Sequence, residues 1–196
     1  TSTCETSRGI GANKMAYRNG TYVAFHANGT NIPGKSDIDY YNLMKAWTAK
    51  TNDDFTMINS HDKASSVRDS SKKATLRASL LERLRNSKNM VLIIGPTTRF
   101  DTDWVPFEIE KAVDSYKIPI IAAYTEFPAV LSPSDLQEFW PQALFDRIND
   151  ETAHVIHIPF KKLAILDAIN RFSHRDPPKG PLVHYTVGAH REWGLM

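Results

Sequence analysis

The sequence predicts an α/β domain built on a parallel sheet, and three observations support this prediction. Two runs, NMVLIIG at 89–95 and IPIIAAY at 118–124, are apolar throughout, as strands buried on both faces are. Segments with apolar residues at helical spacing alternate with the strand-like runs. The connections are short, which is typical of βαβ units with right-handed crossovers. A chain of 196 residues suits one such domain.

The first strand is expected at 21–26, where TYVAFH is rich in β-branched and aromatic residues. The first helix follows at 36–47, and either Ser36 or Asp37 suits its N-cap. A short second strand is expected at 54–59, before a polar loop.

The helix expected at 72–88 carries one apolar stripe, formed by Leu76, Leu80, Leu81 and Leu84. The third strand, 89–95, ends at a Gly-Pro pair, which cannot continue it. A helix at 103–116 then places Trp104, Phe107 and Val113 on its inner side.

After the fourth strand at 118–124, residues 132–148 are expected to be helical with a break at Pro141. Alternating apolar residues predict a fifth strand at 153–160, and helical spacing predicts a last helix at 162–172.

Five strands connected in this way give a flavodoxin-like three-layer sandwich with the strand order 2-1-3-4-5. In such sheets ligands bind beyond the carboxyl ends of the strands, where the order reverses between strands one and three. The segments expected at that edge are 26–34, 59–71 and 95–104, and the start of the 103–116 helix borders it.

The two ends of the chain differ from the middle. Residues 1–16 are small, polar and aperiodic, so we expect them to be disordered or derived from an expression tag. Residues 17–172 form the predicted domain. The extension at 173–196 has three prolines and no clear period, which leaves two alternatives, a wrap over the surface or disorder.

The composition limits the partners and the compartment. A net charge of +2 is too small to indicate nucleic acid, and no run reaches the roughly 18 apolar residues that a membrane span needs. The single cysteine, Cys4, cannot form an internal disulfide and fits a reducing compartment. We therefore expect a cytoplasmic protein that binds neither membrane nor nucleic acid.

Two common enzyme signatures are missing. Neither GxxxxGK[ST] nor GxGxxG occurs, so the glycine-bearing segment 29–34 is interpreted as a turn, although backbone N–H groups near Ser36 could still hold a nucleotide. No GxSxG elbow marks a serine hydrolase, and His61 and Asp62 are merely neighbours in a loop.

The seven histidines raise the question of a metal site. His154 and His157 lie three apart on one predicted strand and so point to opposite faces, and no cysteine accompanies them. We expect no metal.

The helix at 72–88 has a strongly basic side, with six Lys and Arg residues against one acidic residue, Glu82. Such a side either binds an anionic partner or simply solvates the helix. The apolar stripe on the opposite side favours solvation.

Glu108 lies on the same side of its helix as Trp104 and Phe107. Burial beside these aromatic residues would raise the pKa of Glu108 and suit a catalytic carboxylate. Composition alone instead favours a solvated surface glutamate, so both interpretations stay open at this point.

The segment 80–124, LLERLRNSKNMVLIIGPTTRFDTDWVPFEIEKAVDSYKIPIIAAY, resembles the second half of a TIR domain. The shared order is a helix, an apolar strand, a small-residue loop, a tryptophan, a glutamate four residues later, and another buried strand. The first strand, YVAFH, is similar to the opening strand of the family. Its Phe25-His26 pair resembles the bacterial branch that includes the Thoeris antiphage protein ThsB. The resemblance covers about 21–124.

The resemblance implies a TIR-like fold and an NAD-cleaving enzyme, for which NAD is the substrate and no cofactor is needed. It places the catalytic carboxylate on Glu108. It also implies that the substrate is bound by Phe25, His26, Ala27, Asn59 and Trp104. The product would be a signalling nucleotide derived from ADP-ribose, sensed by a separate effector protein in antiphage defence. Assembly into a homo-oligomer is compatible with the family.

Two other functions stay open, a non-catalytic TIR-like scaffold and a module that binds a nucleotide without turning it over. A solvent-open apolar pocket around Glu108 would favour the enzyme, whereas a filled pocket or a salt-bridged Glu108 would favour the scaffold. The choice between hydrolysis, cyclisation and transfer depends on which nucleophile reaches the anomeric carbon, and the sequence does not predict it.

Overall fold

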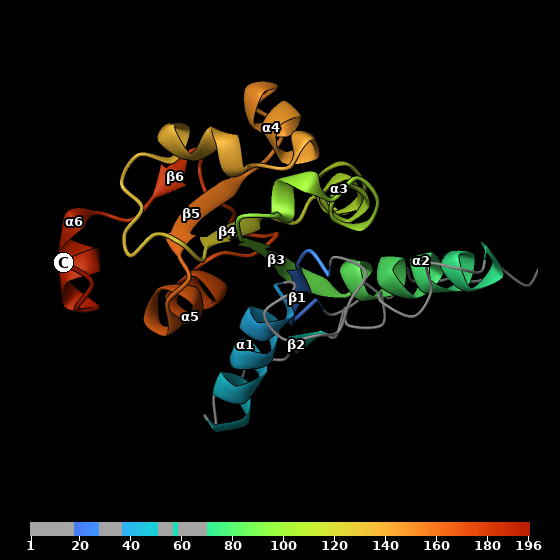
Figure 1. The fold of residues 1–196 in the computed structure, drawn as a ribbon, viewed down its shortest axis with the longest axis horizontal. Coiled ribbons are helices and arrows are strands. Elements are labelled where there is room, and N and C mark those ends of the chain that lie inside the picture. The colour runs from blue at the N-terminus through green and yellow to red at the C-terminus, as the bar shows by residue number, and fades with distance from the viewer. Residues whose placement is uncertain (1–17, 28–36, 51–56, 59–69) are drawn as a thin grey trace, which may run out of the picture.

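The computed structural model describes residues 18–27, 37–50, 57–58 and 70–196 of the chain. Its centre is one sheet of six strands in the order β2-β1-β3-β4-β5-β6, and every neighbouring pair is parallel (Figure 1). The strands are β1 (Gly20–Ala24), β2 (Met57–Ile58), β3 (Ser87–Ile94), β4 (Ile120–Tyr124), β5 (Val155–Pro159) and β6 (Val183–His184). The predicted parallel α/β sheet is confirmed, and a short sixth strand adds to the five expected.

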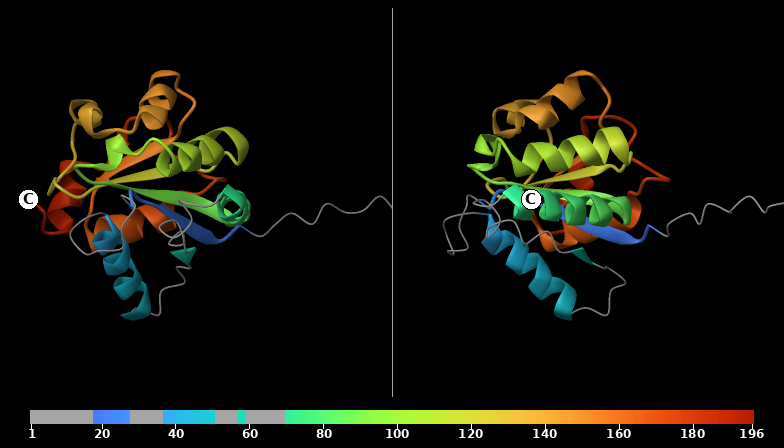
Figure 2. Two further views of the ribbon diagram at one scale, coloured as in Figure 1. Left: turned by 45° about the vertical axis from the view of Figure 1, so that its right-hand side comes forward. Right: turned by 90° about the vertical axis from the view of Figure 1, so that its right-hand side faces the viewer.

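Helices cover both faces of the sheet, because alternate side chains of each buried strand point to opposite sides. On one face, Tyr22, Met90 and Leu92 pack against α2 (Ser70–Arg85), α3 (Trp104–Glu110) and α4 (Gln142–Asn149). On the other face, Val23, Val91 and Ile93 pack against α1 (Ile38–Lys50) and α5 (Lys162–Arg171). Figure 2 shows α3 and α4 on one side of the sheet and α1 and α5 on the other.

Two of the predicted helices are less regular than expected. The 103–116 segment is α3 followed by a π-helical turn, η3 (Lys111–Ser115), in which Tyr116 N–H bonds to the carbonyl of Lys111 at 3.0 Å. The 132–148 segment is a 3-10 helix, η4 (Pro133–Phe139), and then α4, with Pro141 between them as predicted. A further 3-10 turn, η2 (Thr98–Phe100), follows β3.

The carboxy-terminal extension is ordered, so the alternative of disorder is wrong. It contributes β6 and a short helix, α6 (Val187–Glu192), which lies beside α5 at the C-terminal end of the chain (Figure 1). Its backbone is tied to the sheet where His174 N–H donates to the Lys88 carbonyl at 2.8 Å and Val155 N–H donates to the Gly180 carbonyl at 3.0 Å. Such long-range pairing leaves no periodic pattern in a sequence, which is why the tail could not be assigned.

The two histidines considered for a metal site instead hold this tail. His154 Nδ1 lies 2.8 Å from the Pro178 carbonyl, and His157 Nε2 lies 2.9 Å from the Pro181 carbonyl. A carbonyl can only accept, so His157 is protonated on Nε2 and its Nδ1 accepts from the hydroxyl of Tyr124 at 2.8 Å. Burial lowers the pKa of His157 to about 4, which keeps the ring neutral.

Among the residues of the described ranges, no helix is both long and apolar enough to cross a membrane.

Candidate functional site

The residue at which α3 starts determines the position of Glu108. The side chain of Asp101 accepts hydrogen bonds from the N–H groups of Asp103 and Trp104, each at 2.9 Å, which satisfies donors that the first turn of a helix leaves without an intrahelical partner. The helix therefore starts at Trp104 and brings Glu108, one turn later, over the sheet.

The carboxylate of Glu108 is completely buried, with 0% exposure. The hydroxyl of Tyr22, in the middle of β1, donates a hydrogen bond to Glu108 Oε1. Burial first, and the neighbouring carboxylate second, raise the pKa of Tyr22 well above its usual value, so the phenol stays protonated and keeps donating. The interpretation of Glu108 as a solvated surface residue is wrong.

Trp104 lies on the same helix and is 7% exposed. Its ring packs edge-on against Phe107, with the ring centroids 6.4 Å apart. Two cations from α2 lie over the Trp104 ring, Lys73 Nζ at 5.6 Å and Arg77 Cζ at 5.8 Å from its centroid. The basic side of α2 is therefore more than a solvated face, because two of its residues pack on α3.

The predicted site residues do not all lie on one face of the sheet. Phe25 and Ala27 are buried in the cluster on the α1 side, where the Phe25 ring stacks on Tyr41 at 4.9 Å. Glu108 bonds to Tyr22, which belongs to the opposite cluster, so the structure does not bring the Phe25 ring to Glu108. Asn59 lies outside the described residues, as do the turn at 29–34 and the His61-Asp62 pair.

His26 joins two of the segments expected at the carboxyl edge of the sheet. Its Nδ1 lies 3.1 Å from Oγ1 of Thr97, in the turn that follows β3. The contact brings the end of β1 against the segment that leads into α3, where the strand order reverses between β1 and β3.

Asp37, expected from the sequence only as a helix cap, also lies at this edge. Its side chain is buried, and Oδ2 accepts a hydrogen bond of 2.9 Å from the hydroxyl of Thr98. Burial raises the pKa of Asp37 to about 6, against the lowering effect of the hydrogen bonds from Thr98 and the His26 backbone. Position 95 must be glycine for this packing, because a Cβ there would lie 2.3 Å from Asp37 Oδ1. The sequence held two signals for this contact. Asp37 is an acidic residue at the start of a helix, and Gly95 ends the third strand.

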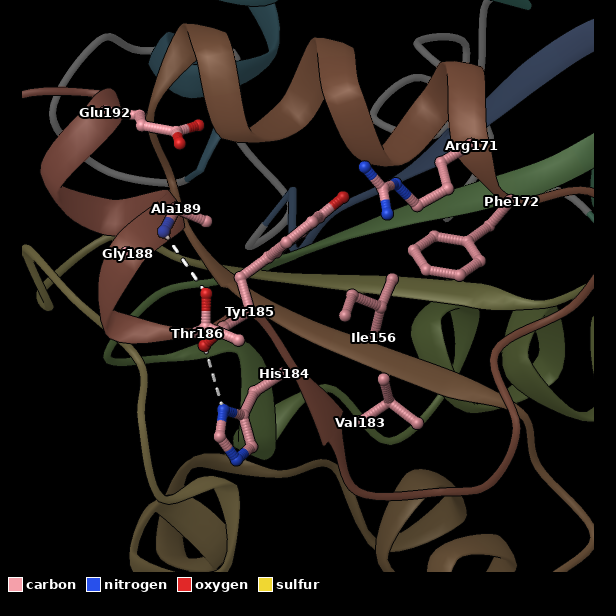
Figure 3. Close-up of a pocket in the computed structure, with 10 residues that line it drawn as sticks. All are labelled: Ile156, Arg171, Phe172, Val183, His184, Tyr185, Thr186, Gly188, Ala189 and Glu192. Atoms are coloured by element: carbon pink, nitrogen blue, oxygen red, sulfur yellow. Dashed lines mark hydrogen bonds between the residues drawn. The ribbon is translucent and has the colours of Figure 1, made fainter.

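A cavity of ≈ 410 Å³ lies on the other side of the sheet, between α5, β6 and α6 (Figure 3). Tyr185 crosses it toward Arg171, whose guanidinium carbon is 5.7 Å from the Tyr185 ring centroid. The Tyr185 hydroxyl donates to Asp167 at 2.5 Å. None of the residues that line this cavity belongs to the group around Glu108.

The part of the chain that the structure describes holds no group of three or more His, Cys, Asp or Glu side chains placed to bind a metal ion. The site instead combines the Glu108 carboxylate and the Tyr22 hydroxyl with the Trp104 ring and the two cations of α2 that lie over it.

Comparison with protein families gives one match. The model of the family described as "Thoeris protein ThsB, TIR-like domain" matches residues 22–128, more than half of the chain. The matched segment runs from β1 past β4 and includes Tyr22, Asp37, Trp104 and Glu108. It ends before β5, so the carboxy-terminal extension and its cavity lie outside the match.

Proposed function

The chain belongs to the family of ThsB TIR-like domains of Thoeris systems, and on that premise we propose that it cleaves NAD between nicotinamide and ribose with Glu108 as the catalytic carboxylate. The product is a signalling nucleotide derived from ADP-ribose, which a separate effector protein senses during antiphage defence. NAD is the substrate, and the reaction uses no metal.

The chemistry follows from the charge that develops on the sugar. The C1′–N bond breaks and its electron pair passes to the pyridinium nitrogen, so nicotinamide leaves as a neutral molecule and the ribose acquires oxocarbenium character. A carboxylate beside the ribose stabilises that positive charge and can hold the ribose hydroxyls. Water then adds to C1′ and loses a proton, giving ADP-ribose, or another nucleophile adds there and gives a cyclic or conjugated product.

The observation that carries this proposal is the family match, which includes Trp104 and Glu108, and the structure adds that the Glu108 carboxylate is buried and accepts a hydrogen bond from Tyr22. Burying a carboxylate costs free energy, and such groups gather at functional sites. The Tyr22 hydroxyl orients one carboxylate oxygen of Glu108. Because Glu108 is 0% exposed, NAD reaches it only when the side chains packed over it move.

The substrate-binding residues are proposed with it. Trp104 supplies an aromatic wall one turn before Glu108, and His26 supplies a polar group at the rim beside Thr97. Phe25 and Ala27 act as buried supports for the strand end. Asn59 stays a prediction from the resemblance.

The second candidate is a non-catalytic scaffold of the same family. Two outcomes were expected from the sequence, a solvent-open pocket around Glu108 for the enzyme or a filled one for the scaffold. A Glu108 side chain with 0% exposure and a tyrosine partner matches the second outcome, and this observation favours the scaffold. The two functions differ in one measurable property, the release of nicotinamide.

The test is nicotinamide release from NAD, with the products identified by mass, for wild type, Glu108→Gln and Glu110→Gln. Glu110 lies on the same helix but is exposed, so it is a matched control. Release by wild type and by Glu110→Gln but not by Glu108→Gln establishes the enzyme, and the product mass separates hydrolysis, cyclisation and transfer. Equal release by all three proteins refutes the role of Glu108. No release over a wide range of protein concentration favours the scaffold.

A further inference from the structure

A cationic cluster connects α2 to the start of α3, and we define it as Lys73, Arg77, Asp103 and Trp104. The Asp103 carboxylate bridges both cations, with Lys73 Nζ at 2.5 Å from Oδ2 and an Arg77 guanidinium nitrogen at 3.3 Å from Oδ1. All three charged side chains are partly exposed, at 36%, 44% and 39% in chain order. The cluster thus holds two positive charges and one negative charge at an accessible position.

Two donors of the cluster have no acceptor. Within the described residues, Nε of Arg77 and Nε1 of Trp104 are buried and make no hydrogen bond. An unsatisfied buried donor is costly, and it is rare enough in folded proteins to need an explanation. Both of these unpaired donors belong to side chains that pack on each other, with the Arg77 guanidinium carbon 5.8 Å from the Trp104 ring centroid.

These donors and charges match one chemical class. A phosphate group carries several acceptor oxygens and negative charge, and arginine binds it with two parallel N–H···O bonds. Asp103 offers a single carboxylate to both cations and leaves the two orphan donors unpaired. A phosphate in place of the Asp103 carboxylate would accept from Lys73 and Arg77, and it has further oxygens that could accept from the two unpaired donors.

We propose that the cationic cluster binds a phosphate-class anion, the pyrophosphate of the dinucleotide. The Asp103 carboxylate competes with this anion for Lys73 and Arg77. The identification of the anion as part of NAD rests on the proposed function. The position of the cluster relative to Glu108 fits this assignment. Trp104, which belongs to the cluster, and Glu108 are four residues apart on one helix, which is about 6 Å along the axis. In NAD only the ribose and one methylene separate the bond to be cleaved from the pyrophosphate.

The first measurement is calorimetric titration of the full chain with inorganic pyrophosphate, which tests the cluster without any turnover. Arg77→Gln and Lys73→Gln are each expected to weaken binding by about tenfold or more, since each removes a charge-assisted contact. Arg77→Lys keeps the charge but loses the two-pronged geometry and is expected to weaken binding less. Trp104→Phe removes the N–H together with part of the aromatic surface and is expected to weaken binding as well.

Asp103→Asn distinguishes the proposal from a simple basic surface. It removes the competing carboxylate, so pyrophosphate is expected to bind about fivefold more tightly, the equivalent of two partly exposed ion pairs. Arg85→Gln is the matched control, because Arg85 is an exposed cation on the same helix and lies outside the cluster. It is expected to leave the affinity unchanged.

The outcomes separate this inference from the proposed function. Pyrophosphate that fails to bind, or that binds all of these variants equally, overturns the inference. Nicotinamide release that depends on Glu108, with an unchanged KM for NAD in the Lys73 and Arg77 variants, overturns it too and leaves the enzyme standing. Cluster-dependent pyrophosphate binding without nicotinamide release supports the anion site and refutes the NAD-cleaving function.

Discussion

Asp37→Asn is expected to stabilise the protein at neutral pH, although it removes a buried residue that makes a specific hydrogen bond. In the structure Asp37 is 4% exposed, and its carboxylate accepts from Thr98 and packs against the backbone of Gly95. Asparagine keeps the shape and an oxygen that can accept from Thr98, but it carries no charge. The substitution therefore isolates the free-energy cost of burying the charge.

The magnitude follows from the pKa of Asp37. Burial raises it from 3.8 to about 6, and this difference corresponds to about 3 kcal/mol of unfolding free energy. Because the folded pKa lies above the unfolded one, the folded state binds the proton more tightly, and the contribution of Asp37 to stability is lost as the pH rises through this window. Asparagine removes this cost, and the pKa of about 6 already includes the effect of the hydrogen bond from Thr98. The expected stabilisation by Asn above pH 7 is therefore about 3 kcal/mol, or about 6–12 °C in Tm.

The assay is thermal unfolding followed by circular dichroism at a series of pH values from 4 to 8, for wild type and variant. His157 titrates in the same range with the opposite sign, but it is common to both proteins and cancels in their difference. The gain from Asn should be near zero at pH 4 and reach its full size by pH 7. Asp150→Asn, at an exposed position, is the control for removing a carboxylate elsewhere in the chain. A variant that is less stable than wild type by the same amount at every pH would refute the reasoning.

Three further predictions concern the same framework. Gly95→Ala is expected to lower the unfolding free energy by about 1–3 kcal/mol, because its Cβ would lie 2.3 Å from Asp37 Oδ1; adding Asp37→Ala should recover part of the loss in a double-mutant cycle, and additive losses would contradict the clash. Acidification from pH 6.5 to 4 should remove about 3 kcal/mol of wild-type stability through His157, whose neutral form is favoured in the fold; urea unfolding of His157→Gln should lack this part of the slope, and an unchanged slope would assign it to another group. Tyr22→Phe should cost about 1–3 kcal/mol by taking the donor from buried Glu108; denaturant unfolding measures it, and a neutral result would show that the bond is not needed for folding.

Much of the fold could be predicted because strands that are buried on both faces of a sheet have a locally apolar sequence. The central strands β3 and β4 are apolar runs bounded by glycine, proline or polar residues, and the α2 stripe has clear helical spacing. The break at Pro141 followed from the lost N–H and the ring of proline. The π-helical turn after α3 had no such signal, because its sequence is compatible with an ordinary helix.

The candidate site was only partly predictable. Glu108 and Trp104 stand at a spacing that puts them on one side of a helix, so their proximity needed no tertiary information. The partner of Glu108 did, because Tyr22 is 86 residues away in the chain and meets it only when β1 lies beside β3. Phe25 lies three positions from Tyr22, on the opposite face of the sheet, and this separation from Glu108 depends on which face α3 covers.

By itself, the sequence determined the α/β class, the parallel strands, the helix that carries Glu108 and the resemblance to the TIR family, because these depend on composition and spacing within short segments. The tertiary structure alone decided that Glu108 is buried against Tyr22, that Lys73 and Arg77 meet at Asp103, that Asp37 is buried with a raised pKa, and that the tail adds β6. Each of these depends on groups that are distant in the chain and on the water that their contact excludes. Neither the contact nor the loss of water exists until the sheet has brought the segments together.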